Sequence, residues 1–106
     1  MKMILAVVQA DDAAKVMQAL TSAGHRVTRI ATQGAWLRRE NTTLLLGVAD
    51  HQVEDVLNIL KQTAQRRISY IPSPREVPGA MSTKVMDVEV GGATVFVLNV
   101  ERFEQL

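Results

Sequence analysis

Near its start the chain reads Met3-Ile4-Leu5-Ala6-Val7-Val8, an unbroken apolar run that predicts a buried strand. Asp11 or Asp12 then suits the N-cap of a helix, because a carboxylate accepts hydrogen bonds from the free N–H groups of a first helical turn. Gly24 predicts the end of this helix, because glycine adopts a left-handed backbone at little cost. The apolar stripe of the helix consists of Val16, Met17, Leu20 and Ala23.

Two further strands and a second helix are predicted next. The strands are expected over residues 26–32 and 42–48, with a loop over residues 33–41 between them. Asp50 is then expected to cap the second helix. The buried stripe of that helix consists of Val53, Val56, Leu57 and Leu60.

Residues 65–84 show no sustained period and contain all three prolines of the chain. They therefore predict a long, mobile loop without a regular element, and such a loop within a compact domain is typically functional. Residues 85–90 alternate between apolar and acidic side chains, which predicts a strand with one solvated face. Gly91-Gly92 indicates a tight turn, so residues 93–100 should return as the second strand of a C-terminal hairpin.

This order of elements predicts one α+β domain over residues 1–106. The fold class is ferredoxin-like, an antiparallel sheet with two helices on one face and a long loop between the second helix and the C-terminal hairpin. The predicted strands are apolar on both faces, so the face without helices should be covered by further copies of the chain. The strand residues that indicate this are Val27, Ile30, Leu44, Leu45, Leu46, Val95, Phe96 and Val97.

Composition excludes several classes of protein. The chain has 106 residues, 47% of them hydrophobic and 22% charged, which is enough for a globular core. It has no cysteine, which excludes disulfide scaffolds, thiol nucleophiles and thiolate zinc sites. A net charge of +1 does not suggest binding to nucleic acid polymers. No apolar run is long enough for a transmembrane helix, so we expect no membrane partner.

No enzyme template matches the sequence. The two histidines, His25 and His51, do not form a metal-spaced pair, and both are expected at the surface. Nucleophile elbows, phosphate-binding loops and zinc-protease motifs are missing from the sequence. We therefore expect no catalytic residue, no metal and no cofactor.

The residue types between Arg26 and Gly47 suit a nucleotide. Four arginines precede Glu40, and arginine matches phosphate oxygens. Asn41 can present a donor and an acceptor to an adenine edge, and Trp36 can stack on a base. Each feature also has an ordinary interpretation, with the arginines in a solvated turn and the tryptophan in the core or at an oligomer interface.

Several blocks of the sequence resemble the PII-like cyclic-di-AMP receptor family of bacteria. The most specific are Trp36-Leu37-Arg38 running into Asn41-Thr42-Thr43, and the block Val88-Glu89-Val90-Gly91-Gly92-Ala93-Thr94-Val95-Phe96-Val97. The resemblance covers the whole chain. It implies a cytoplasmic, non-enzymatic homotrimer that binds one cyclic dinucleotide in each inter-subunit cleft. Its loops would reorganise on binding and signal to an unidentified protein partner.

The resemblance also implies roles for individual residues. Thr28, Asn41 and the backbone of Gly47 match positions that hold one adenine. Arg26 matches a basic position near the phosphates. The loop over the ligand would contain Gly34, Ala35, Trp36 and Leu37, and the pocket would be completed by Phe96 and Gln105.

The sequence departs from the usual family loop at three positions. Where the family has glycine, phenylalanine and glycine, this chain has Ala35, Trp36 and Glu40. Ala35 limits positive φ, Glu40 adds an anion, and Trp36 retains a ring for stacking. An alternative function therefore stays open, a PII-like protein-interaction module that binds another adenine nucleotide or none.

Overall fold

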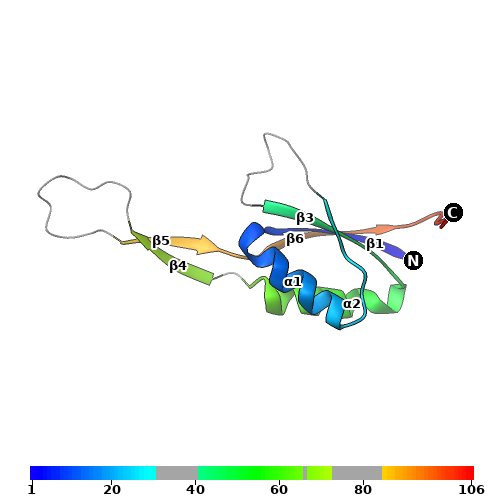
Figure 1. Cartoon of the computed structure of the whole chain (residues 1–106), viewed down its shortest axis with the longest axis horizontal. Coiled ribbons are helices and arrows are strands. Elements are labelled where there is room, and N and C mark those ends of the chain that lie inside the picture. Colours follow the sequence, from blue (N-terminus) through cyan, green and yellow to red (C-terminus); the bar gives the residue numbers. More distant parts are fainter. Residues whose placement is uncertain (31–40, 66, 73–84) are drawn as a thin grey trace, which may run out of the picture.

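The computed structural model describes residues 1–30, 41–65, 67–72 and 85–106, and it has an α+β architecture (Figure 1). Four strands form an antiparallel sheet in the order β2-β3-β1-β6, and two further strands pair separately as β4-β5. The helices α1 and α2 lie on one side of the four-stranded sheet (Figure 1). The elements are β1 (Lys2–Gln9), α1 (Ala10–Ser22), β2 (Thr28–Ile30), β3 (Asn41–Val48), the short 3-10 helix η1 (Asp50–Gln52), α2 (Val53–Thr63), β4 (Arg67–Pro72), β5 (Val85–Val90) and β6 (Ala93–Asn99).

The core lies between the sheet and the two helices. Alternate residues of the central strands point into it, because successive side chains of a strand face opposite sides. The apolar residues of the helices, which recur at helical spacing, pack against these strand residues. The core consists of Ile4, Ala6, Val8, Ala13, Val16, Leu20, Leu44, Leu46, Val48, Val56, Leu60 and Ala64. The predicted ferredoxin-like arrangement, with two helices on one face of an antiparallel sheet, is confirmed.

Gly24 ends α1 as predicted. Its φ is +90°, and its N–H donates to the carbonyl of Thr21 at 3.0 Å. The N–H of His25 donates to the carbonyl of Leu20 at 3.0 Å. These two bonds form a Schellman motif, which satisfies carbonyl groups that the end of a helix leaves free.

The predicted helix caps are wrong at both helices. Gln9 is the N-cap residue of α1 and makes no side-chain cap bond, while Asp11 and Asp12 lie within the first turn. Asp50 begins η1 rather than α2 and lies 2.9 Å from the amino group of Met1. Hydrogen bonding to that ammonium group, with its charge, lowers the pKa of Asp50.

The β4-β5 pair corrects the prediction for the last third of the chain. Residues 67–72 form a strand although they end in Pro72, which occupies the last position of β4, where proline is tolerated. The expected hairpin is also wrong, because β5 pairs with β4 and β6 pairs with β1. We call β4 and β5 together the arm. It projects beyond the end of the four-stranded sheet (Figure 1).

Candidate functional site

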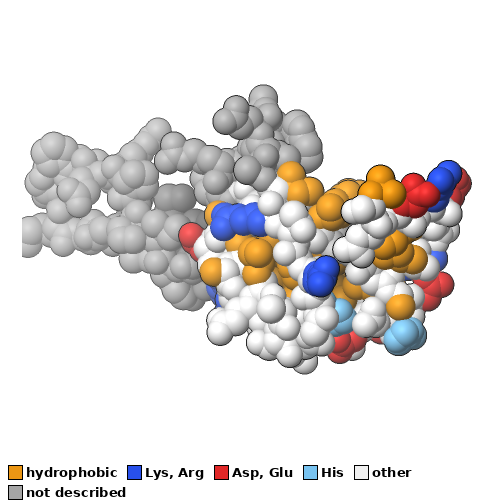
Figure 2. Space-filling view, turned by 45° about the vertical axis from the view of Figure 1, so that its right-hand side comes forward, with side chains coloured by type: hydrophobic (Ala, Val, Ile, Leu, Met, Phe, Trp, Pro, Cys, Tyr) orange, Lys and Arg blue, Asp and Glu red, His pale blue; other side chains and the backbone are white. Residues whose placement is uncertain are grey.

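No helix among the described residues covers the second face of the four-stranded sheet, which we call the open face and which is largely apolar. Residues paired across neighbouring strands share a face, so the registers give rows across the sheet. One row consists of Thr28, Leu45, Leu5 and Phe96. Phe96 is 54% exposed, although aromatic side chains of this size usually lose most of their surface on folding. Figure 2 shows hydrophobic side chains at the surface in patches between charged groups.

A polar hollow lies at one end of this face. It has a volume of about 220 Å³ and is lined by Val7, Val8, Gln9, Asn41, Gly91, Gly92, Ala93 and Thr94. Gln9 and Asn41 are opposite one another, at the end of β1 and the start of β3. Their two carboxamides supply both donors and acceptors, which suits the edge of a base or a phosphate oxygen.

One side of the hollow is held in place by a hydrogen bond between the side chain of Gln9 and the backbone of Gly91. The N–H of Gly91 donates to Gln9 Oε1 at 2.9 Å. Gly91 has a φ of +85°, and a Cβ built on it would lie 2.1 Å from the carbonyl oxygen of Gln65. Only glycine therefore fits at this position. The next residue, Gly92, donates its N–H to the carbonyl of Ala64 at the end of α2.

The base of the arm is joined to α1 by an ion pair. Arg67 Nη2 lies 2.8 Å from Asp12 Oδ1, and Arg67 Nη1 lies 3.4 Å from Oδ2. The side chain of Asp12 is only 3% exposed, whereas that of Arg67 is 45% exposed. Hydrogen bonding to Asp12, with the charge of that carboxylate, raises the pKa of Arg67 above its ordinary value. The guanidinium therefore stays charged at neutral pH.

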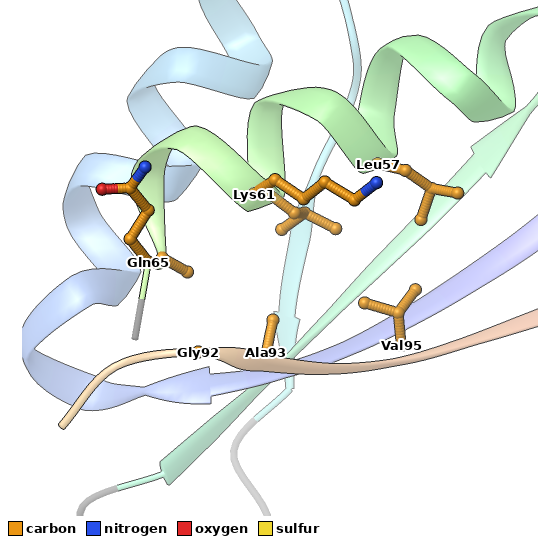
Figure 3. Close-up of a pocket in the computed structure, with 8 residues that line it drawn as sticks. Leu57, Lys61, Gln65, Gly92, Ala93 and Val95 are labelled. Atoms are coloured by element: carbon orange, nitrogen blue, oxygen red, sulfur yellow. The ribbon is translucent and has the colours of Figure 1, made fainter. Parts of the chain in front are cut away.

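A second, apolar groove separates α2 from β6. Its volume is about 390 Å³, and in Figure 3 Leu57 of α2 and Val95 of β6 face one another across it. The lining is completed by Leu60, Lys61, Ala64, Gln65, Gly92 and Ala93. The groove exists because the helices cover β1 and β3 more fully than β6, whose Val97 is 44% exposed.

The predicted ligand-binding residues fall into three groups. Thr28, Gly47 and Phe96 lie on the open face, because their registers place them opposite Leu45, Met3 and Leu5. Arg26 is exposed just before β2, and Gln105 is exposed in the C-terminal tail. Outside the described residues lie Gly34, Ala35, Trp36 and Leu37.

Asn41 also belongs to the open face, but at its far end. Gly47 lies six positions further along β3, which corresponds to about 20 Å along an extended strand. Thr28 is paired near the Gly47 end. A single chain therefore does not bring Asn41 and Gly47 to the same adenine ring.

One arginine of the basic stretch is used within the fold. Arg29 pairs with Leu44 on the helix side of the sheet, and its Nε donates to Thr42 Oγ1 at 3.1 Å. It therefore does not reach the open face beside Thr28. The other described arginine of this stretch, Arg26, is exposed and lies just before β2.

The histidine prediction is wrong for one of the two residues. The side chain of His25 is only 4% exposed, and its Nε2 lies 2.8 Å from Asp55 Oδ2 of α2. His51 is exposed, as predicted. Within the described ranges, no three histidine, aspartate or glutamate side chains lie close enough together to hold a metal ion.

Three residues of the hollow were missed in the sequence. Gln9 carried a signal, since it is a polar residue that ends an otherwise apolar strand. Gly91 and Gly92 were interpreted only as a turn, and both do have positive φ. Their contacts with Gln9 and Ala64 bridge more than 25 positions of the chain, so no local pattern could reveal them.

Comparison with known proteins gives the family. The model of the family described as "Cyclic-di-AMP receptor" matches residues 1–106. The chain belongs to the cyclic-di-AMP receptor family. Membership in a receptor family implies a role in binding rather than in catalysis, and the ligand of the family is a cyclic dinucleotide.

A solved structure supports the same PII-like fold for this receptor. It is the crystal structure of a functionally unknown protein from Pediococcus pentosaceus ATCC 25745. The two chains share 32% sequence identity over 99% of this chain and 96% of the other, with a TM-score of 0.76. In the part of the receptor that the structure describes, no helix has both the length and the apolar character needed to cross a membrane.

Proposed function

We propose that the protein is a homotrimeric receptor that binds cyclic-di-AMP in clefts between subunits, and that binding changes the conformation of its loops. The observation that carries this proposal is the polar hollow beside Asn41, at the end of an otherwise apolar open face. An asparagine carboxamide can donate to and accept from the edge of an adenine. The family match supplies the class of ligand.

The length of β3 supports a site between subunits. Asn41 and Gly47 lie about 20 Å apart in one chain, so they contribute to opposite ends of the open face. Where copies meet head to tail in a closed ring, each subunit presents different ends of its face to its two neighbours. Asn41 of one subunit would then share a cleft with Thr28 and Gly47 of the next.

The exposed apolar surface supports the ring itself. Phe96, Leu98 and Phe103 are each more than 40% exposed in a single chain. Contiguous apolar surface of this kind is rare on monomers and is typical of subunit interfaces. Phe96 lies on the same face as Thr28 but on the opposite edge strand, so closing the ring would bury it against a neighbouring subunit.

The proposal includes a signal to an unidentified protein partner. The arm is the described element best suited to carry it, because it projects from the sheet and an isolated pair of strands is only marginally stable. A ligand shifts such an element when it binds one of its conformations more tightly than the other.

Isothermal titration calorimetry with cyclic-di-AMP, cyclic-di-GMP and ATP tests the ligand. At about 50 μM protein, roughly ten times a Kd of about 5 μM, we expect heat with cyclic-di-AMP at one site per subunit. Asn41→Ala should weaken binding by about 1–3 kcal/mol, because an edge of the adenine loses its partner. Asn58→Ala, at an exposed position of α2, is the matched control and should bind normally.

Three outcomes would contradict the proposal. Heat with ATP and none with cyclic-di-AMP would favour the alternative module that binds another adenine nucleotide. Equal affinity of the Asn41→Ala and Asn58→Ala variants for cyclic-di-AMP would show that Asn41 does not contact the ligand.

Native mass spectrometry measures the oligomeric state. A monomer at micromolar concentration would refute the cleft between subunits.

A further inference from the structure

The corner between β1 and α1 holds both strands of the arm at their base. At this corner Gln9 accepts a hydrogen bond from the N–H of Gly91, the first residue after β5. Three residues further on, Asp12 forms the ion pair with Arg67, the first residue of β4. One short stretch of chain therefore contacts the arm where it begins and where it ends.

The same corner borders the polar hollow. Gln9 is directly opposite Asn41 in the sheet, and both line the hollow together with Gly91 and Thr94. A ligand that reaches Asn41 from this side therefore lies within reach of the Gln9 carboxamide. Oε1 of that group accepts from Gly91, and its amide nitrogen carries two donors for an acceptor on a ligand.

The Cβ side of Gly91 is packed closely against the start of β4. A Cβ on Gly91 would lie 2.6 Å from Arg67 Nη1 and 2.1 Å from the oxygen of Gln65. Arg67 Nη1 itself donates to that oxygen at 3.0 Å. The backbone of Gly91 is thus packed against the start of β4, and its position limits the position of Arg67.

We propose that Gln9 is a positioning residue that couples ligand binding at Asn41 to the base of the arm. A ligand that accepts a hydrogen bond from the Gln9 amide nitrogen fixes the carboxamide with Oε1 toward Gly91. The Gly91 hydrogen bond then opens less often, and the arm is held more firmly. This coupling rests on the proposed function, since it needs a ligand in the hollow.

Coupling of this kind is reciprocal. If ligand reduces the opening of the Gly91 hydrogen bond through Gln9, then loss of that bond must weaken the ligand by the same factor. A role of Gln9 in the fold alone would change the opening of Gly91 without any dependence on ligand. The two possibilities therefore differ in a measurable quantity.

Hydrogen exchange of the Gly91 amide, followed by NMR with and without cyclic-di-AMP, tests the proposal. In the wild type we expect the ligand to slow this exchange. In Gln9→Leu, which removes the acceptor, exchange without ligand should rise by roughly fivefold, as expected for a bond of ordinary strength. Ligand should no longer slow it, and the Kd should rise by at least the protection factor that was lost, because leucine also lacks the amide donor for the ligand.

Gln9→Glu separates the two halves of the mechanism. Its carboxylate still accepts from Gly91, so exchange without ligand should stay near the wild-type rate, but it has no amide donor for the ligand. Thr94→Val is the control for exchange without ligand, because it changes the lining of the same hollow but leaves the Gln9–Gly91 hydrogen bond intact. Gln9 makes no side-chain cap bond to α1, so its replacement should not weaken the start of that helix through a lost cap.

Three results would overturn the coupling. Gly91 exchange in Gln9→Leu at the wild-type rate would refute the role of the hydrogen bond. Faster exchange with unchanged ligand affinity would leave Gln9 with a role in the fold alone. If the ligand still slowed Gly91 exchange in Gln9→Leu, the coupling would not depend on Gln9. If the wild type binds no cyclic-di-AMP, the proposed function fails and the coupling falls with it, although the ligand-free exchange rates still report on the bond.

Discussion

The four-stranded sheet and the arm are held by different kinds of interaction. The sheet packs its buried leucine, isoleucine and valine residues against two helices, in a cluster of apolar side chains. The arm is a pair of strands whose described contacts with the rest of the chain are polar and lie at its base. Burial holds a region by the sum of many weak contacts, whereas a few polar bonds can open one at a time. This difference allows the arm to respond to a ligand while the sheet keeps its shape.

The largest expected effect comes from the core. Leu46→Ala removes a side chain that is fully buried in β3, and we expect a loss of about 2–5 kcal/mol in the free energy of unfolding. Leu106→Ala, at a fully exposed position, is the control and should change it by less than about 0.5 kcal/mol. Urea denaturation at one protein concentration measures both. Similar free energies of unfolding for the two variants would mean that burial of Leu46 does not stabilise the sheet.

A smaller effect is expected at the glycine that joins the arm to the sheet. Gly91→Ala and Gly24→Ala each place a methyl group on a backbone of positive φ, at a cost of about 1–2 kcal/mol. The methyl group at Gly24 meets no atom within 4 Å, whereas at Gly91 it overlaps the carbonyl of Gln65. We therefore expect Gly91→Ala alone to loosen the arm.

Limited proteolysis distinguishes these two glycine variants. Cleavage within the arm should be faster in Gly91→Ala than in Gly24→Ala, while the part of the chain in the sheet stays resistant in both. Equal cleavage rates would show that the arm does not depend on the packing of Gly91. Loss of resistance throughout Gly91→Ala would show that arm and sheet unfold together, which would abolish the contrast between them.

The smallest effect on overall stability is expected at the ion pair. Asp12→Asn keeps an oxygen acceptor for Arg67 but removes the charge, so the base of the arm should open more often with little change in melting temperature. Asp11→Asn removes a neighbouring, exposed charge and is the matched control. Hydrogen exchange of the β4 and β5 backbone amides measures the opening. Equal exchange in the two variants would exclude Asp12 as an anchor.

The same contrast explains what the sequence could predict. Strands β1 and β3 follow from short apolar runs and both helices from apolar stripes at helical spacing, because burial against a core requires apolar side chains at these positions. The end of α1 follows from Gly24, since a left-handed residue is a local requirement. The ferredoxin-like arrangement and the open apolar face then follow from the order of these elements.

The arm and its anchors could not be predicted in this way. Pro72 indicated a loop, but it occupies only the last position of β4. Asp12 indicated a helix cap, but its partner is Arg67, 55 positions away in the chain. His25 is buried because Asp55 of α2 lies beside it, a contact that has no trace in local spacing. Partners distant in the chain decide each of these cases.

The site was predictable to the extent that it follows strand alternation. Thr28, Gly47 and Phe96 share the open face because their registers require it. The residues alone did not distinguish a nucleotide site from a solvated turn. The class of ligand came from the resemblance to a family. The placement of Gln9 beside Gly91 depends on how β6 returns to β1, and only the structure shows it.

The corner formed by residues 9–12 also has a consequence for how this chain can vary. This corner binds Arg67 at the start of β4 and Gly91 just after β5. The two ends of the arm are therefore held close together. Doubling the length of a flexible segment with fixed ends costs only about 0.6 kcal/mol. The arm is therefore a site at which evolution, or an engineer grafting a reporter, can exchange one segment for another without rebuilding the sheet.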